Sequence, residues 1–302
     1  MSDAVAVVRR FNRSYTQRIG VLKDSFLGLG MPLGPARLLF EIGAAAQVET
    51  GAAAQDPLTT QTLRERLGLD SGYLSRLLRR LEKDGLIRVT PDPGDRRRRQ
   101  VSLTEAGRER WQELEHRSDD QARLIVDPLT ERQRERLARA LAEADLLVRA
   151  ATVTFALADP SSPVARDVVG RYFAEIGRRF GFDASGEADK DAKVLVPPAG
   201  AFVVAVSDGD PVACGGLQTI AVGVGELKRM WVRGDWRGAG LGTRLLRHLE
   251  DRCWELGHGT VRLDTNAALT EAIAMYHRAG YRAIPRYNDN PWATNFFEKR
   301  LI

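Results

Sequence analysis

One glycine-rich stretch in the second half of the chain restricts its possible folds most. Residues 227–246 have the sequence LKRMWVRGDWRGAGLGTRLL, which predicts a strand, a turn and an amphipathic helix in succession. Gly238, Gly240 and Gly242 let the backbone come close to a ligand, because glycine has no Cβ. The N–H groups at the start of the helix and the guanidinium of Arg237 suit a diphosphate. Since the spacing matches neither the dinucleotide fingerprint nor a Walker loop, an ordinary glycine-rich turn is the alternative.

Two further pieces follow this stretch in order. They are the strand VRLDTN at residues 261–266 and the segment AIAMYHRAGY at residues 272–281. Together the three pieces resemble the GNAT superfamily of acetyl-CoA-dependent N-acetyltransferases, from about Glu226 to Tyr281. The resemblance implies an α/β fold with a mixed, bulged central sheet over residues 151–302. It also implies acetyl transfer from acetyl-CoA to a primary amine of a small molecule, such as an amino acid.

The same resemblance assigns roles to individual residues. Tyr276 corresponds to the tyrosine that protonates the departing thiolate, and a phenol of pKa about 10 suits a thiol leaving group. Glu226 corresponds to the carboxylate that accepts the amine proton. A core aromatic and an ordinary strand-edge charge are the respective alternatives. The residues expected to bind acetyl-CoA are Met230, Trp231, Val232, Arg237, Gly238, Ala239, Gly240, Leu241, Gly242, Thr243 and Asn266.

Some of these expectations leave alternatives open. Met230, Trp231 and Val232 would bond the pantetheine arm through their main chain, and the irregular alternation around them is compatible with a bulge. Asn266 could bond the pantetheine or cap the next helix. The polar segment RYNDNPW at residues 286–292 could hold the acceptor amine through Tyr287, Asn288, Asp289 and Asn290, or form a side-chain-bonded turn. No metal is expected.

The first half contains a pair of short helices after Leu58. Thr59 is expected to cap a helix to Leu67, and Asp70 or Ser71 a second helix to about Lys83. The second helix has one apolar face, formed by Leu74, Leu77, Leu78 and Leu81. Tyr73, Arg76 and Arg80 lie on the opposite face, as in a helix that reads DNA bases. A solvated helix face is the alternative.

A hairpin with an arginine-rich tip follows at residues 91–99. Its Asp95-Arg-Arg97, with Leu103-Thr-Glu-Ala-Gly107, resembles the winged helix-turn-helix of the MarR family, over roughly Phe11 to Arg149. By that resemblance Arg97 enters a minor groove, Asp95 orients the wing, and the neighbouring arginines bind phosphates. The segment from Gly43 to Gln55 departs from the family pattern. The residues expected to bind DNA are Ser71, Gly72, Tyr73, Ser75, Arg76, Arg80, Asp95, Arg96, Arg97, Arg98 and Arg99.

Charge and length support two domains, at residues 1–150 and 151–302. Up to Ala150 the chain has 26 Lys and Arg against 22 Asp and Glu, and after it 19 against 18. The positive excess therefore lies mainly in the half that resembles a DNA-binding domain. Apolar stripes on its terminal helices, including Leu137, Leu141 and Val148, predict a homodimer. A dimer suits palindromic double-stranded DNA.

The remaining elements are predicted from periodicity and turn residues. Helices are expected from Ala4 to Leu27, over residues 36–46, after Thr104, after Thr130 and over residues 164–180, with a loop over residues 47–57. Strands are expected near residues 151–158, 202–206, 211–218 and 294–301, with a turn at Asp208-Gly209.

The N-terminus lacks the features of a signal peptide, and no apolar run has the length of a membrane span. Cys214 and Cys253 are expected to be buried free thiols, which favours a reducing cytoplasm.

The two resemblances predict a bifunctional DNA-binding transcription regulator and N-acetyltransferase. A regulator whose GNAT half only senses acetyl-CoA is one alternative. An enzyme whose winged helix serves only for dimerisation or for holding a partner is another.

Overall fold

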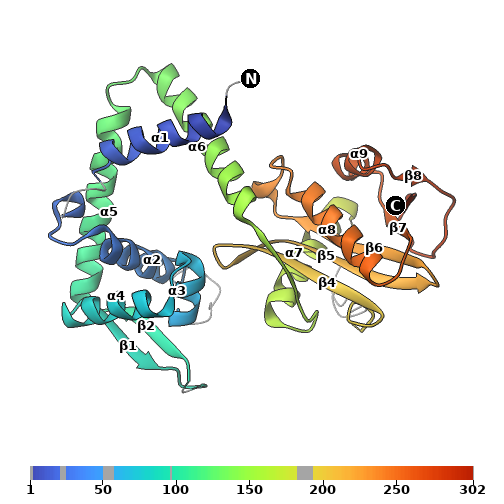
Figure 1. Cartoon of the computed structure of the whole chain (residues 1–302), viewed down its shortest axis with the longest axis horizontal. Helices are drawn as coiled ribbons and strands as arrows, with labels where there is room; N and C mark the ends of the chain where they lie inside the picture. Colours follow the sequence, from blue (N-terminus) through green and yellow to red (C-terminus); the bar gives the residue numbers. More distant parts are fainter. Residues whose placement is uncertain (1–2, 21–24, 50–57, 96, 182–192, 302) are drawn as a thin grey trace. The chain divides into compact units, whose positions relative to one another are not determined.

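The computed structural model describes residues 3–20, 25–49, 58–95, 97–181 and 193–301 (Figure 1). The chain divides into two compact units, Met1–Arg139 and Ala140–Ile302. The division falls inside one helix, α6 (Glu131–Thr152), ahead of the expected boundary at residue 150. Within the described ranges, no helix has the length and apolar character needed to cross a membrane.

The first unit consists of helices and one two-stranded hairpin. Besides the start of α6, its elements are α1 (Ala4–Arg18), η1 (Phe26–Gly28), α2 (Leu33–Glu49), α3 (Thr60–Leu67), α4 (Ser71–Lys83), β1 (Ile87–Pro91), β2 (Arg99–Leu103) and α5 (Glu105–Val126). Thr59, Asp70 and Thr104 each cap the helix that follows by accepting an N–H of its first turn. Helices α3 and α4 with the hairpin β1–β2 form the predicted winged helix-turn-helix.

Three predicted helix boundaries in this unit are wrong. The helix expected to reach Leu27 ends at Arg18, and Gly20 follows in the left-handed conformation. Helix α2 starts before Ala36, because Pro35 lies in its first turn, where a missing N–H needs no partner. Helix α2 also continues to Glu49, into the expected loop, whose residues 50–57 lie outside the described residues.

The core of the first unit contains the predicted apolar face of α4. All four leucines of that face are buried, and they pack with Leu38, Leu39 and Ile42 of α2 and Trp111 of α5. Gly107 brings α5 against the segment before β1, because a Cβ at this position would overlap the carbonyl oxygen of Leu86. The LTEAG segment therefore requires glycine at its last position.

The second unit is a seven-stranded mixed sheet with helices on both faces. Besides the end of α6, its elements are β3 (Thr154–Leu157), α7 (Pro163–Phe180), β4 (Gly200–Ser207), β5 (Asp210–Ala221), β6 (Val224–Val232), η2 (Gly234–Trp236), α8 (Leu241–Glu255), β7 (Thr260–Thr265), α9 (Thr270–Arg278), β8 (Arg282–Ala283) and β9 (Asn295–Arg300). The strand order is β3-β4-β5-β6-β7-β9-β8, in which β6 and β7 are parallel and the other pairs antiparallel. Asp208 and Gly209 both have positive φ in the turn between β4 and β5.

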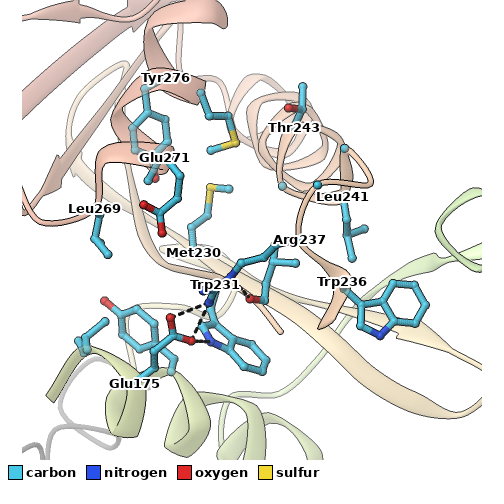
Figure 2. Close-up of a pocket in the computed structure, with 18 of the residues that line it drawn as sticks. Glu175, Met230, Trp231, Trp236, Arg237, Leu241, Thr243, Leu269, Glu271 and Tyr276 are labelled. Carbon is cyan, nitrogen blue, oxygen red and sulfur yellow. Dashed lines mark hydrogen bonds and ion pairs between the residues drawn. The ribbon is translucent and has the colours of Figure 1, made fainter. Parts of the chain in front are cut away.

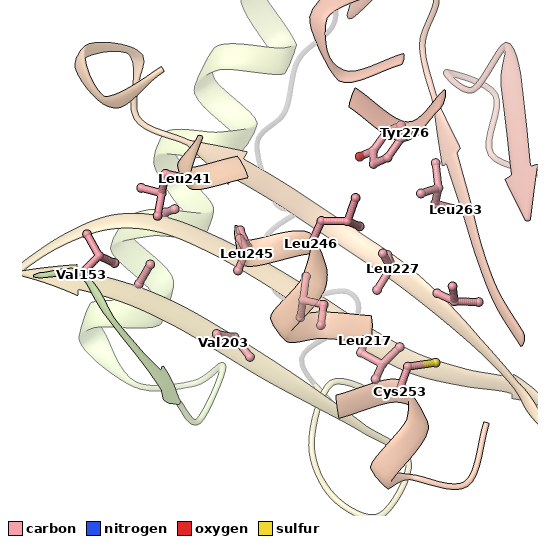
Figure 3. Packing of buried hydrophobic residues seen from close by; sticks show 14 of the residues in the cluster. Val153, Val203, Leu217, Leu227, Leu241, Leu245, Leu246, Cys253, Leu263 and Tyr276 are labelled. Carbon is pink, nitrogen blue, oxygen red and sulfur yellow. The ribbon is translucent and has the colours of Figure 1, made fainter. Parts of the chain in front are cut away.

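Successive side chains of β4 point to opposite faces of the sheet, and an apolar layer lies on each face. Val203 and Ala205 pack with the leucines of α8, as Figure 3 shows for the larger cluster, while Phe202 and Val204 pack with Val168 of α7. Each helix therefore covers one face of the sheet.

Strand β6 carries the predicted bulge. Trp231 pairs with Cys214 and Lys228 with Gly216, so two residues of β6 lie opposite one residue of β5. Arg229 lies in this extra length with a φ of 54°. Beyond it, β6 no longer pairs with β7, because their parallel ladder ends at Leu227 and Leu263.

Replacement of Gly107 by alanine tests the contact with Leu86. Gly107→Ala is expected to lower the free energy of unfolding by about 2–3 kcal/mol, because the added methyl group has no space. In the matched change Gly170→Ala in α7, the added methyl group meets no atom within 4 Å. This change should raise the free energy of unfolding by about 0.5–1 kcal/mol. Urea unfolding of the full chain, followed by circular dichroism, measures both. Unchanged stability of Gly107→Ala would contradict the packing described above.

Candidate functional site

A cavity of about 380 Å³ lies in the second unit beside the bulge of β6 (Figure 2). Residues from β6, the glycine-rich turn, α7 and α9 line it. Of the residues expected to bind acetyl-CoA, those that line it are Met230, Trp231, Val232, Arg237, Gly238, Gly240, Leu241, Gly242 and Thr243, and the expected acid Tyr276 lines it too. The structure therefore brings the glycine-rich turn and Tyr276 to one cavity.

The first turn of α8 is open to a ligand. Gly238 and Gly240 have φ values of 88° and 77°, which side chains with a Cβ rarely adopt. Gly240 is the N-cap of α8, and no side chain of the described residues caps this helix. The N–H groups and the positive end of the helix dipole are thus available for an anion. These donors fit the diphosphate of a nucleotide.

Arg237 is held by the protein on two sides. Its Nε donates to the carbonyl oxygen of Val232 at 3.0 Å, and its Nη2 lies 2.6 and 2.7 Å from the two carboxylate oxygens of Glu175. Glu175, on α7, also accepts a hydrogen bond of 2.8 Å from Nε1 of Trp231. Burial opposes ionisation of Glu175, but these hydrogen bonds outweigh it and hold the pKa of the carboxyl below its ordinary value. No sequence pattern singles out Glu175, since its helix is far from the turn in the chain.

Tyr276 belongs both to the cavity wall and to the core. Its side chain is 6% exposed, and its ring lies 5.7 Å from that of Tyr281. Burial, followed by the negative charge of Asp264, raises the pKa of Tyr276 above its ordinary value. Tyr276 therefore keeps its proton at neutral pH, as a proton donor must.

Glu226 and Tyr276 line two different cavities. Glu226 lines a second cavity of about 400 Å³ with Tyr287, Asn288 and Asn290, three of the residues expected to hold the acceptor. One oxygen of its buried carboxylate accepts from the Tyr287 hydroxyl at 2.7 Å and from Asn288 Nδ2 at 3.0 Å. The other accepts from Gln218 Nε2 at 2.5 Å. Lys228 Nζ adds an ion pair at 3.1 Å, so Glu226 already has four donors.

Asp264 is a carboxylate of this region that the sequence did not identify. Its Oδ2 accepts from Asn288 Nδ2 at 2.6 Å and lies 3.5 Å from Lys228 Nζ. Burial, followed by the charge of Asp264, raises the pKa of Tyr276, whereas for Tyr287 burial and then Glu226 raise the pKa more than Asp264 does. The charge of Asp264 therefore adds to the raised pKa of a tyrosine in each cavity. Its position on β7, two residues before Asn266, was the available sequence signal.

Three expected site residues are placed elsewhere. Asn266 uses its amide within the protein, donating to the carbonyl oxygen of Trp292 at 2.7 Å and accepting from the N–H of Ala268 at 2.9 Å. Ala239 packs against the core cluster. Asp289 is exposed and lines neither cavity.

The first unit presents the residues expected to bind DNA on α4 and the wing. Tyr73, Arg76 and Arg80 are exposed, and the Arg76 guanidinium lies 5.6 Å from the centre of the Tyr73 ring. A groove of about 450 Å³ lies between α3, α4 and the wing strands, and Ser71, Ser75 and Arg99 line it. It also contains Arg64 and Arg79, which the sequence analysis missed. The spacing of Arg79 from Ser75, whose Oγ accepts from Arg79 Nη2 at 3.0 Å, could have indicated it.

Two aspartates shape the tip of the wing. Asp95 Oδ1 accepts from the N–H of Arg97 at 3.0 Å, which agrees with its expected orienting role. Asp92, which the sequence analysis did not single out, accepts from the N–H groups of Gly94 and Asp95. Arg97, Arg98 and Arg99 are exposed, and Arg96 lies outside the described residues.

Both cysteines are free and buried. In the described ranges, no group of three or more His, Cys, Asp or Glu side chains is arranged to hold a metal ion.

Comparison with known proteins gives two family matches in this one chain. The family described as the acetyltransferase (GNAT) family matches residues 170–281, and the MarR family matches residues 52–98. An IAA acetyltransferase of Azospirillum brasilense is 32% identical over 130 residues, which cover 40% of this chain and 85% of that protein. An N-acetyltransferase of Schizosaccharomyces pombe, described as uncharacterized, is 28% identical over 127 residues, 41% of this chain and 78% of that protein.

Two solved structures are each similar to about half of this chain. A GNAT-family acetyltransferase from Staphylococcus aureus has 18% identity and a TM-score of 0.45, and the match covers 50% of this chain and all of that one (100%). The S. aureus MepR–DNA complex has 21% identity and a TM-score of 0.37, covering 48% of this chain and 97% of that one.

Replacement of Glu226 tests the cluster around its carboxylate. Glu226→Gln should lower the free energy of unfolding by about 1–3 kcal/mol, because the amide turns a donor toward buried donors. Glu298→Gln is the matched control, since Glu298 pairs with Arg262 nearer the surface, and its loss should stay below about 1 kcal/mol. Urea unfolding again measures both. Equal losses for the two variants would contradict a special role for the Glu226 cluster.

Proposed function

We propose that both halves of this chain are active; the chain belongs to the GNAT acetyltransferase family, and its residues 52–98 match the MarR family. The C-terminal half transfers an acetyl group from acetyl-CoA to a primary amine of a small molecule. The N-terminal half binds palindromic double-stranded DNA and regulates transcription. Free, buried Cys214 and Cys253 agree with a reducing, cytoplasmic location.

The observation that carries the enzymatic proposal is the joint position of three features in one cavity. These are the uncapped first turn of α8, the fixed guanidinium of Arg237 and the Tyr276 side chain. The first two suit the diphosphate of CoA. The main chain at the bulge, from Met230 to Val232, precedes them in the chain and lines the same cavity, which suits the pantetheine arm.

In the proposed reaction the amine nitrogen attacks the thioester carbonyl, and the C–S bond breaks as the C–N bond forms. Tyr276, whose phenol is protonated at neutral pH, gives its proton to the departing sulfur. The amine proton leaves toward the carboxylates of Glu226 and Asp264 on the acceptor side. Tyr287, Asn288 and Asn290 line the cavity there.

One observation favours the alternative of an acetyl-CoA sensor. Glu226 already has four donors, so it can accept a further proton only if one of them is displaced. A sensor needs the CoA cavity and no proton acceptor. Binding of CoA without turnover of any amine would therefore support the sensor.

The proposed regulator is a homodimer. Helix α1 has no buried residue, and its apolar Val5, Val8, Phe11 and Tyr15 are 64%, 54%, 47% and 41% exposed. Such an apolar face is typical of a surface that another chain covers. A two-fold dimer would place two copies of α4 on two half-sites of a palindrome.

Removal of the Tyr276 hydroxyl tests the enzymatic proposal. Tyr276→Phe should lower kcat by about 100-fold, the scale of a lost general acid, and leave the Kd for CoA unchanged. Thiol release from acetyl-CoA with a panel of small amines and amino acids measures kcat, and calorimetry measures Kd. The control is Tyr281→Phe, a neighbouring buried tyrosine outside the cavity lining. Full turnover in Tyr276→Phe would remove its assigned role.

Replacement of a wing arginine tests DNA binding. Affinity for a palindromic duplex should fall steeply with salt, and Arg97→Ala should reduce the slope of log K against log salt by about 1. Arg123→Ala, an exposed arginine paired with Asp120 near the far end of α5, should leave the slope unchanged. Fluorescence anisotropy of a labelled duplex at several salt concentrations measures this slope. A flat salt response of the unmodified protein would exclude phosphate contacts.

A further inference from the structure

Glu175 connects two of the residues that we assign to acetyl-CoA. It lies on α7, opposite the glycine-rich turn, and Figure 2 shows its carboxylate joined to both Arg237 and Trp231. The contacts are 2.6 and 2.7 Å to Arg237 Nη2 and 2.8 Å from Trp231 Nε1. Neither family resemblance nor the sequence pattern assigned this residue a role.

These contacts fix the guanidinium of Arg237 in one orientation. Its Nε is bound to the Val232 carbonyl, and its Nη2 to Glu175. Within the described part of the chain, no acceptor is bonded to its Nη1. A planar guanidinium held through two nitrogens can turn the third toward a ligand without further loss of freedom.

The negative charge of Glu175 is shared with a second arginine. Arg179 Nε lies 3.2 Å from Glu175, and Arg179 Nη1 lies 2.8 Å from Glu271 of α9. The four side chains together carry no net charge, so Glu175 repels an approaching phosphate only weakly. Its effect on Arg237 is therefore expected to exceed that repulsion.

We propose that Glu175 is a positioning residue for acetyl-CoA. It orients Arg237 so that the free nitrogen meets the diphosphate, and it holds the Trp231 ring against the cavity wall. This inference rests on the proposed binding of acetyl-CoA and adds a residue that acts on the cosubstrate through Arg237.

The experiment is a double-mutant cycle on CoA affinity in the full chain. Glu175→Gln keeps the size of the side chain but turns an amide N–H toward the donors of Arg237 or Trp231. The Kd for CoA should rise about tenfold, the scale of one lost charge-assisted hydrogen bond. Arg237→Gln should raise it at least as much. The double variant should be no weaker than Arg237→Gln alone, because Glu175 acts through Arg237.

Controls separate this role from folding and from the proposed function. Asp167→Asn removes an acidic charge from the same helix, at an exposed residue paired with Arg171, and should leave the Kd unchanged. Thermal unfolding of each variant shows whether it is folded. If the unmodified protein does not bind CoA, the proposed function itself fails.

Two outcomes would overturn the positioning role. Tighter CoA binding by Glu175→Gln would show that the carboxylate competes with the diphosphate for Arg237. Additive losses in the double variant would show that Glu175 acts independently of Arg237, as a residue with only a structural role would.

Discussion

The separation of β6 from β7 after four paired residues is the feature on which the candidate active site depends. An extra residue at Arg229 bends β6 away, and the parallel ladder ends at Leu227. The cavity beside this bulge receives the start of α8 on one side and Glu175 of α7 on the other. Because the ladder with β7 stops at Leu227, the edge of β6 from Met230 to Val232 that faces away from β5 borders the cavity that Tyr276 also lines.

One buried or half-buried carboxylate holds the neighbouring side chains in place at each of the two cavities. Glu175 organises the cosubstrate side by holding Arg237 and Trp231, and Glu226 organises the acceptor side by holding Tyr287 and Asn288. Both have every carboxylate oxygen engaged by donors, so each holds its neighbours in place, and Glu226 can take up the amine proton only when one of its donors is displaced. Asp264 lies on the acceptor side, where its Oδ2 accepts from Asn288 Nδ2 and lies 3.5 Å from Lys228 Nζ. The charged groups around the site therefore include Glu175 and Asp264, to which the family resemblance assigned no role.

The features that depend on residues close together in the chain could be predicted from the sequence. The leucine spacing of α4, the caps Thr59 and Thr104, and the bulge of β6 follow from residues close together in the chain, and the structure confirms them. Glu175 and Asp264 could not be predicted in this way, because their partners lie on elements distant in the sequence. The start of α2 was misplaced because Pro35 in a first helical turn has the same sequence signal as a helix break.

The central claim is that the N–H groups at the start of α8 bind the diphosphate of CoA. Hydrogen–deuterium exchange of the full chain, with and without CoA, tests it most directly. We expect the amides of residues 238–243 to exchange more slowly when CoA is bound, because a phosphate oxygen accepts their hydrogens. Saturating CoA that leaves the exchange of these amides unchanged would contradict the claim.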